Sequence, residues 1–294
     1  MTAADPLAPY PHVLSRRGGR VIAWHEYGVL ENPQQTVLYC HGTPGSGYEA
    51  LFLDEAAHQL GIRIIALDRP GLGASDPVDY RTVRGWVEDD LLAVVEHLGL
   101  ERLSVIGFSG GGPHAMGIAA RLPELVDRLV LLAPFTHHAA WSTRLGLAFT
   151  PLRVHLSHLT MSWFPKVLID SLARGAGLLL AGRSASLEAF VRSVQGRSGA
   201  YRMAVAHDYA LQFAIRGGVQ DEYAIQGDWG FSEASVRVRT DIWVAGRDKA
   251  VKPARVRNLG LRMGATLHEL PQDGHFSLLI NHGWEILGSL VKDG

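Results

Sequence analysis

The chain has 294 residues, which is enough for one large domain with an inserted subdomain or for two small domains. Apolar residues make up 47% of it and charged residues 19%, as in an ordinary globular protein, and the net charge is −1. Because charges of both signs are spread along the chain, no basic stripe or acidic tail indicates a nucleic acid or membrane partner.

Cysteine content and hydropathy further restrict the class of protein to which the chain can belong. The single cysteine, Cys40, excludes an intrachain disulfide and a cysteine-based structural zinc site, and its apolar neighbours predict a buried strand residue. Met1–Pro11 holds three prolines and no apolar core, unlike a signal peptide. We expect no transmembrane helix, because no run of about 18 apolar residues is free of charges and breakers. A cytoplasmic protein is therefore predicted.

Strand and helix patterns alternate from about residue 12 to residue 133. The predicted strands are His12–Arg16, Arg20–Glu26, Thr36–Cys40, Ile62–Leu67, Leu103–Ile106 and Val126–Ala133, and the predicted helices are Glu49–Leu60, Val83–Leu98 and Gly110–Leu122. Gly18-Gly19 indicates a hairpin between the first two strands. This alternation of apolar strands with helices predicts a mostly parallel α/β sheet covered on both faces.

The alternation stops between about Phe135 and Ser232, where helical stretches are rich in aromatic, histidine and methionine residues. After Val236 it resumes: the predicted elements are the strands Asp241–Ala245 and Ala265–Leu270 and the helices Pro253–Met263 and Phe276–Val291. We therefore predict one core domain, residues 1–134 and 236–294, with a helical cap subdomain inserted at 135–235. Some cap aromatics are expected to line a pocket, although they could instead form only the cap's own small core.

The strongest local signal is Gly107-Phe108-Ser109-Gly110-Gly111, between a predicted strand and a predicted helix. In that context G-x-S-x-G predicts a sharp turn that holds a nucleophilic Ser109 in a strained conformation at the carboxyl end of the sheet. The outer glycines let the neighbouring strand and helix approach, and the helix N-terminus suits a developing oxyanion. A purely structural glycine turn is the alternative.

A serine hydroxyl needs a neighbouring base, and the chain has 14 histidines. We predict His275, because its loop follows the last predicted strand and so reaches the same rim of the sheet as Ser109. His41 is expected to brace its own loop by hydrogen bonding, and His114 to pack inside the helix after the nucleophile.

The carboxylate that fixes the histidine tautomer is predicted to be Asp248, which follows a strand end and precedes His275 in the chain. The alternative for Asp248 is a helix cap. Asp241 lies at the other end of the same strand, at the opposite rim, and Asp273 is expected to shape the turn before His275.

An oxyanion hole needs two N–H donors, which are predicted to be Gly110, after the nucleophile, and Thr43, in the loop after an early strand. Pro44 has no N–H to offer. Phe108, Trp141 and Phe276 are the candidate substrate-binding side chains. We expect no metal ion and no organic cofactor.

Together these segments resemble successive landmarks of the α/β-hydrolase superfamily. The landmarks are His41–Gly45, Asp68–Ser75, Gly107–Gly111, Gly246–Asp248 and Gly274–Phe276, in the family's order over nearly the whole chain. The resemblance implies an eight-stranded sheet with a helical cap between its sixth and seventh strands. Asp68–Ser75 resembles a structural loop of the superfamily, and we assign it no chemistry.

Within the superfamily, the run that begins at His41 is similar to the proline iminopeptidase and bacterial esterase branch. The chain departs from the iminopeptidases where Gly110 replaces the expected tryptophan. Ser109 argues against epoxide hydrolases and haloalkane dehalogenases, which use an aspartate there. The stretch from Gln212 through Asp221 to Phe231 resembles uncharacterised bacterial hydrolases, and we expect Gln212 and Asp221 to be solvated surface positions.

These features predict a serine hydrolase that cleaves a carboxylic ester, or a related acyl bond, of a small hydrophobic substrate through an acyl-enzyme on Ser109. Two alternatives stay open. One is a cofactor-free lyase, C–C bond hydrolase or cyclase on the same fold, and the other is a ligand-binding protein that turns over slowly. The partner is expected to be a small molecule, with no nucleic acid or membrane, and the chain to be a monomer or homodimer.

Overall fold

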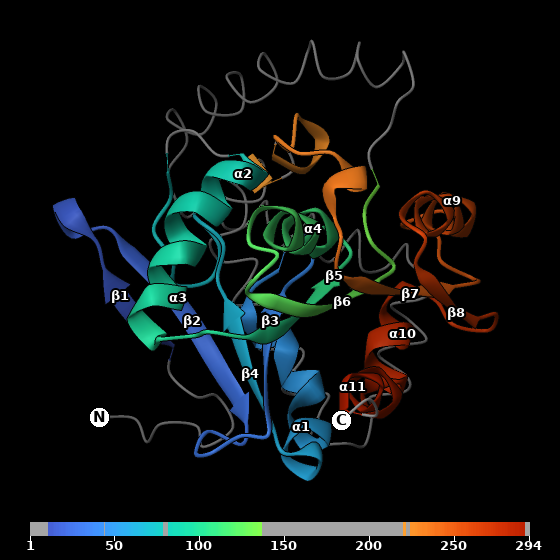
Figure 1. Cartoon of the computed structure of the whole chain (residues 1–294), viewed down its shortest axis with the longest axis horizontal. Coiled ribbons are helices and arrows are strands. Elements are labelled where there is room, and N and C mark those ends of the chain that lie inside the picture. Colours follow the sequence, from blue (N-terminus) through green and yellow to red (C-terminus); the bar gives the residue numbers. More distant parts are fainter. Residues whose placement is uncertain (1–10, 44, 79–81, 137–219, 222–223, 292–294) are drawn as a thin grey trace, which may run out of the picture.

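An eight-stranded sheet runs through the chain in the order β1-β2-β4-β3-β5-β6-β7-β8 (Figure 1). The computed structural model describes residues 11–43, 45–78, 82–136, 220–221 and 224–291. The strands are β1 (His12–Ser15), β2 (Val21–Gly28), β3 (Gln35–Cys40), β4 (Ile62–Leu67), β5 (Leu103–Phe108), β6 (Val126–Leu132), β7 (Arg239–Ala245) and β8 (Thr266–Leu270). Strand β2 pairs antiparallel with β1 and β4, and all other neighbours are parallel. The predicted mostly parallel, eight-stranded sheet is confirmed.

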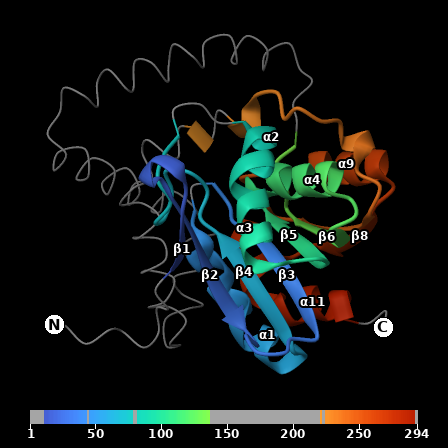
Figure 2. The same ribbon diagram turned by 60° about the vertical axis from the view of Figure 1, so that its left-hand side comes forward.

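Helices cover both faces of this sheet (Figures 1 and 2). One face carries α2 (Val83–Trp86), α3 (Leu92–Leu98), α4 (Gly111–Arg121) and α9 (Pro253–Met263); the other carries α1 (Asp54–Leu60), α10 (His275–Asn281) and α11 (Gly283–Val291). Alternate strand residues supply two separate cores. Leu38 and Cys40 pack on the α4 side, whereas Val37 and Tyr39 pack on the α1 side.

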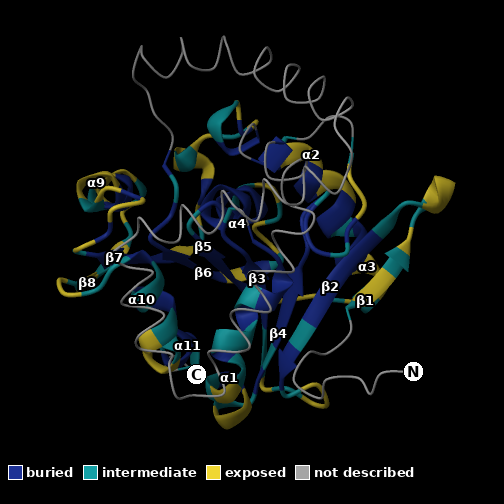
Figure 3. Cartoon of the chain, turned by 180° about the vertical axis from the view of Figure 1, so that it is seen from behind, coloured by how far each residue is buried: buried dark blue, intermediate teal, exposed yellow. Residues whose placement is uncertain are grey.

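Burial on both faces explains why the central strands read as continuous apolar runs. All six residues of β5 are buried. Figure 3 shows the buried centre of the sheet, with exposed residues at the tip of the β1–β2 hairpin and on outer helix faces. At that tip the hairpin closes through a short 3₁₀ turn, Arg17–Gly19, as the glycine pair predicts.

Three predicted helices are subdivided. Val83–Leu98 contains a π-helical turn, Val87–Leu91, between α2 and α3. Glu49–Leu60 begins instead with a 3₁₀ helix, Gly47–Leu53, before α1. The C-terminal helix is two helices, α10 and α11, because the backbone leaves helical geometry at His282, with φ −118° and ψ 20°.

The predicted cap lies mostly outside the described residues, which omit 137–219 and 222–223. Trp141 and Gln212 fall in that gap, and the 135–235 boundary stays a prediction. Of the described part, a 3₁₀ turn, Glu233–Ser235, leads back to β7. Among the described helices, none is long and apolar enough to cross a bilayer.

Candidate active site

Ser109 occupies a strained turn between β5 and α4. Its φ is +52°, in the left-handed region that non-glycine residues seldom adopt. Hydrogen bonds hold the turn: Ser109 N–H donates to the Leu132 carbonyl at 2.9 Å, and the Ser109 carbonyl accepts from the N–H groups of Gly112 (3.0 Å) and Phe135 (2.8 Å).

The outer glycines of the motif are required by close packing. A Cβ on Gly107 would lie 2.6 Å from the Ala115 Cβ, and one on Gly111 would overlap the carbonyl oxygen of Cys40 in β3. Strand β3 and helix α4 therefore crowd the turn from two sides, and the two glycines allow this approach.

His275 and Asp248 meet at the same rim of the sheet, where the loops after β7 and β8 converge. The distance from His275 Nδ1 to Asp248 Oδ2 is 2.6 Å, and both residues are buried. An ionised Asp248 places the proton on Nδ1 and leaves Nε2 as the acceptor that a general base needs. The other carboxylate oxygen, Oδ1, accepts from the N–H groups of Ala250 (2.7 Å) and Val251 (2.9 Å). Asp248 thus caps a turn and orients the imidazole at once.

Two aromatic side chains flank this imidazole. The Phe108 ring lies 4.8 Å from the His275 ring, and the Phe276 ring lies edge-on to it at 5.3 Å. Phe108 is only 1% exposed, so its ring supports the histidine from within the core. That Phe108 and Phe276 contact a substrate stays a prediction, and Trp141 lies outside the described residues.

Three further titratable residues near the rim, His41, His114 and Asp273, lie in local structure. His41 is fully buried; its Nε2 accepts from the Arg69 N–H at 3.2 Å and its Nδ1 donates to the Gly42 carbonyl at 2.8 Å. His114 is fully buried in α4. Asp273 accepts from the Ser277 hydroxyl at 2.8 Å within its own turn. These observations agree with the predicted bracing and packing.

The two predicted oxyanion donors lie side by side. A Cβ built on Gly110 would be 2.7 Å from the Thr43 Cβ and 3.2 Å from the Thr43 backbone nitrogen. A side chain at position 110, such as the tryptophan of the iminopeptidases, would therefore collide with Thr43 where it stands. That these two N–H groups bind an oxyanion stays a prediction.

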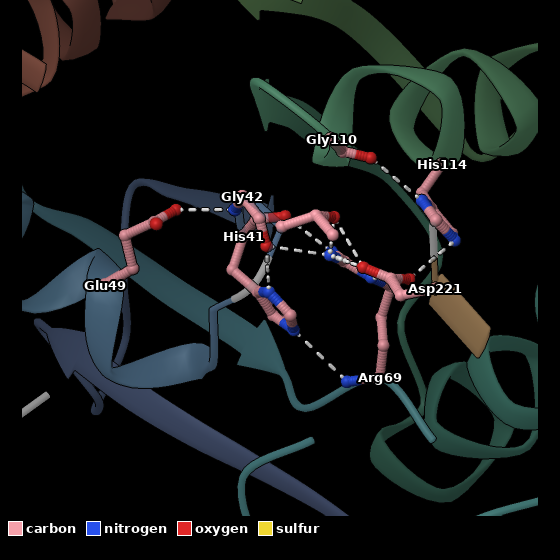
Figure 4. A network of polar contacts seen from close by, with 8 residues as sticks. His41, Gly42, Glu49, Arg69, Gly110, His114 and Asp221 are labelled. Carbon is pink, nitrogen blue, oxygen red and sulfur yellow. Dashed lines mark hydrogen bonds and ion pairs between the residues drawn. The ribbon is translucent and has the colours of Figure 1, made fainter. Parts of the chain in front are cut away.

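A buried ion pair beneath Thr43 was missed by the sequence analysis (Figure 4). Arg69 donates to Asp221 through Nε (2.9 Å to Oδ1) and Nη2 (2.7 Å to Oδ2), and both side chains are at most 1% exposed. The expectation that Asp221 is solvated is wrong, because its charge is compensated by Arg69. Burial lowers the Arg69 pKa to about 10, which still leaves the guanidinium charged at neutral pH.

Arg69 also holds the loop after β3. Its Nη1 donates to the His41 carbonyl, and its Nη2 donates to the Gly42 carbonyl at 2.8 Å and to Thr43 Oγ1 at 3.0 Å. The Thr43 hydroxyl in turn donates to Asp221 Oδ2 at 2.5 Å. The place of Arg69 after β4, at the same rim, is the one sequence signal that could have found it.

Glu49 is a second carboxyl group against this loop, also not predicted. Its Oε1 accepts from the Gly42 N–H at 2.8 Å and from the Tyr39 hydroxyl at 2.9 Å. Burial raises the Glu49 pKa to about 7, against the opposing effect of these hydrogen bonds and of Arg69.

Comparison with known proteins yields relatives of several activities. A 2-hydroxy-6-oxononadienedioate/2-hydroxy-6-oxononatrienedioate hydrolase from Pseudomonas sp. is 27% identical over 182 residues, 57% of this chain and 64% of that protein. A cis-3-alkyl-4-alkyloxetan-2-one decarboxylase from Shewanella oneidensis is 31% identical over 153 residues, 49% of this chain and 45% of that protein. The chain thus spans less than two thirds of the length of either curated relative.

The fold and the family are clear from two further matches. An esterase from Exiguobacterium antarcticum superposes with a TM-score of 0.69 at 18% identity, covering 96% of this chain and 99% of that one. At that identity the likeness concerns the fold alone. A family model described as the alpha/beta hydrolase fold matches residues 35–281. The landmarks from His41 to Phe276 are thereby accounted for, and the chain belongs to the α/β hydrolase fold family.

Proposed function

We propose that this chain is a serine hydrolase that cleaves a carboxylic ester, or a related acyl bond, of a small and mostly apolar substrate. The observation that carries the proposal is the strained Ser109 at the end of β5, on the rim where Asp248 holds Nδ1 of His275 at 2.6 Å. A nucleophile set in a strained turn, with a buried histidine–carboxylate pair on the same rim, fits covalent acyl transfer.

The reaction has two stages. Ser109 Oγ attacks the carbonyl carbon as its proton passes to Nε2 of His275, and Asp248 stabilises the imidazolium. The N–H groups of Thr43 and Gly110 hold the oxyanion, the bond to the leaving alcohol breaks, and the alcohol takes the proton from His275. Water then attacks the acyl-enzyme and gives His275 a proton, which returns to Ser109 as the carboxylic acid leaves.

A second candidate is hydrolysis of a C–C bond next to a ketone, supported by the 27% identity to a hydrolase that is named for an oxo-dienedioate. The 31% identity to a decarboxylase likewise supports a lyase reaction as an alternative. Ester turnover that depends on Ser109 would favour the first proposal. Turnover of a vinylogous diketone but of no ester would favour the C–C bond reaction.

The test combines a fluorophosphonate probe with a panel of p-nitrophenyl esters of short and medium chain length. We expect the probe to add to Ser109, located by mass spectrometry, and Ser109→Ala to lose ester turnover by a factor of about 10³ or more. Asp248→Asn, which reverses the tautomer preference of His275, is expected to lower kcat by about 10⁴. Absence of both the label and Ser109-dependent turnover would contradict the proposal.

A further inference from the structure

Hydrogen bonds with neighbouring side chains hold the peptide groups of the loop after β3. In the peptide between His41 and Gly42, the carbonyl accepts from Arg69 and the N–H donates to Glu49. In the next peptide, the Gly42 carbonyl accepts from Arg69 Nη2 and from His41 Nδ1, both at 2.8 Å. Among the described residues, the Thr43 N–H has no hydrogen-bond acceptor.

The Gly42 carbonyl and the Thr43 N–H belong to one planar trans peptide, so the two bonds point in opposite directions. Arg69 and His41, by holding the carbonyl, therefore turn the Thr43 N–H away from themselves. Thr43 lies directly beside Gly110, the second predicted donor. In Figure 4, Gly110 lies on the upper side of this network and the backbone of Arg69 on the lower side.

Asp221 fixes the position of the Arg69 guanidinium group, which in turn holds the Gly42 carbonyl. It engages the guanidinium through two parallel hydrogen bonds, a geometry that restricts both the position and the plane of Arg69. It also accepts the Thr43 hydroxyl proton, so the Thr43 side chain is held together with the backbone. Asp221 reaches this place from the connection between β6 and β7, 152 residues beyond Arg69.

We propose that Arg69 and Asp221 are positioning residues of the oxyanion hole, through which the β6–β7 connection sets the direction of the Thr43 N–H. The inference rests on the proposed function and adds two residues to its machinery. Neither touches the reacting atoms: Asp221 orients Arg69, and Arg69 orients the peptide that stabilises the oxyanion. Ester hydrolysis should therefore lose transition-state stabilisation when the pair is broken, while substrate binding changes little.

The main variant is Asp221→Asn, which keeps the size of the side chain and removes its charge. We expect kcat for a p-nitrophenyl ester to fall at least tenfold with KM changed less than about threefold, since loss of one oxyanion donor costs about 10²–10³ in kcat. The rate of fluorophosphonate labelling at Ser109 should fall with kcat. The pH at which kcat is half-maximal should stay unchanged, because the His275–Asp248 pair is untouched.

Asp241→Asn is the matched control. Asp241 also pairs with an arginine, Arg128, and both are buried, but the pair lies at the opposite rim of the sheet. This variant should lower stability without changing kcat. If Asp221→Asn does not fold, Thr43→Val replaces it, since that substitution removes only the hydroxyl held by Asp221 and Arg69. Thr43→Ser should then recover at least part of the lost kcat.

The results separate the two proposals. A selective loss of kcat and labelling in Asp221→Asn or Thr43→Val, absent in Asp241→Asn, would establish the positioning role. Unchanged kcat in a folded Asp221→Asn or Thr43→Val, or an equal loss in Asp241→Asn, would overturn it while leaving the serine hydrolase proposal intact. Labelling and turnover that survive Ser109→Ala would instead overturn the proposed function itself.

Discussion

The carboxyl group of Glu49, which can gain or lose a proton, lies directly against the loop that carries Thr43. Its Oε1 accepts the Gly42 N–H, and its pKa of about 7 follows from burial. The positive charge of Arg69 opposes this rise, because it favours the ionised form of Glu49. Near neutral pH the carboxyl group is therefore about half protonated.

This pKa makes the stability of the fold depend on pH. Because the folded pKa of about 7 exceeds the ordinary value of 4.5, the native state binds more protons than the unfolded state between those values. The free energy of unfolding should fall as pH rises from 4.5 through 7, by up to about 3 kcal/mol. Urea unfolding between about pH 5 and pH 8 should show that Glu49→Gln lacks this decline.

Glu55→Gln supplies the control for that measurement, because Glu55 is an exposed carboxyl group on α1. It should keep the wild-type pH dependence. A Glu49→Gln variant whose stability declines with pH as steeply as that of the wild type would contradict the assignment.

The residues that sequence could and could not predict differ in one physical respect. Ser109 is marked by glycines that its own turn requires, and His275 and Asp248 by their positions after strands, so local chain geometry identifies them. Asp221 carries no such mark. A carboxylate in a helical stretch is ordinarily solvated, but Asp221 is buried against Arg69, which lies 152 residues away in the chain.

Elements show the same division between local and long-range causes. β4 and α9 match their predicted bounds, since apolar residues on both faces define the strand, and Pro253 and Gly264 bracket the helix. The interruption at His282 was not predicted, because the apolar residues on either side indicate one helix, although Asn281-His282-Gly283 interrupts them. In the structure His282 contacts Asp273 through its Nε2 at 3.1 Å, a partner that the helical pattern does not indicate.

The start of α4 offers a test at the scale of one element. A methyl group at Gly111 would overlap the Cys40 carbonyl oxygen and lie 2.6 Å from that of His41. Gly111→Ala should therefore lower the free energy of unfolding by about 2 kcal/mol or more, since backbone atoms of β3 must move. It should also slow fluorophosphonate labelling, because the same movement displaces the Ser109 turn. Urea unfolding and labelling kinetics measure the two effects.

Gly288→Ala is the comparison, since Gly288 lies within α11 and, among the described residues outside its own helix backbone, no atom lies within 4 Å of a Cβ built there. There alanine should stabilise the helix by up to about 1 kcal/mol. A Gly111→Ala protein as stable and as reactive as Gly288→Ala would show that β3 and α4 do not crowd the turn.

Across the whole molecule, the two rims of the sheet carry different sets of polar residues. The loops after β3, β4, β5, β7 and β8 bring Thr43, Arg69, Ser109, Asp248 and His275 to one rim, as expected for parallel strands. At the other rim, Arg128 joins β6 to β7 through Asp241 and to α11 through the Ser289 carbonyl. The sheet joins the two rims, so the candidate active site keeps its geometry only while the strands between them stay paired.

Cys40 can report whether the sheet opens. It ends β3 near the middle of the sheet, it is 2% exposed, and burial raises its pKa to about 12. The thiolate is the reactive form, so at about pH 8 the native thiol should be nearly inert, and a disulfide reagent such as DTNB should react only as fast as the chain unfolds. Leu261→Cys, made at a position 75% exposed on α9, should react at once in the same chain. If Cys40 reacts as quickly as that introduced thiol under native conditions, the centre of the sheet opens locally, and β3 cannot be the rigid support from which Arg69 and Asp221 aim the Thr43 N–H.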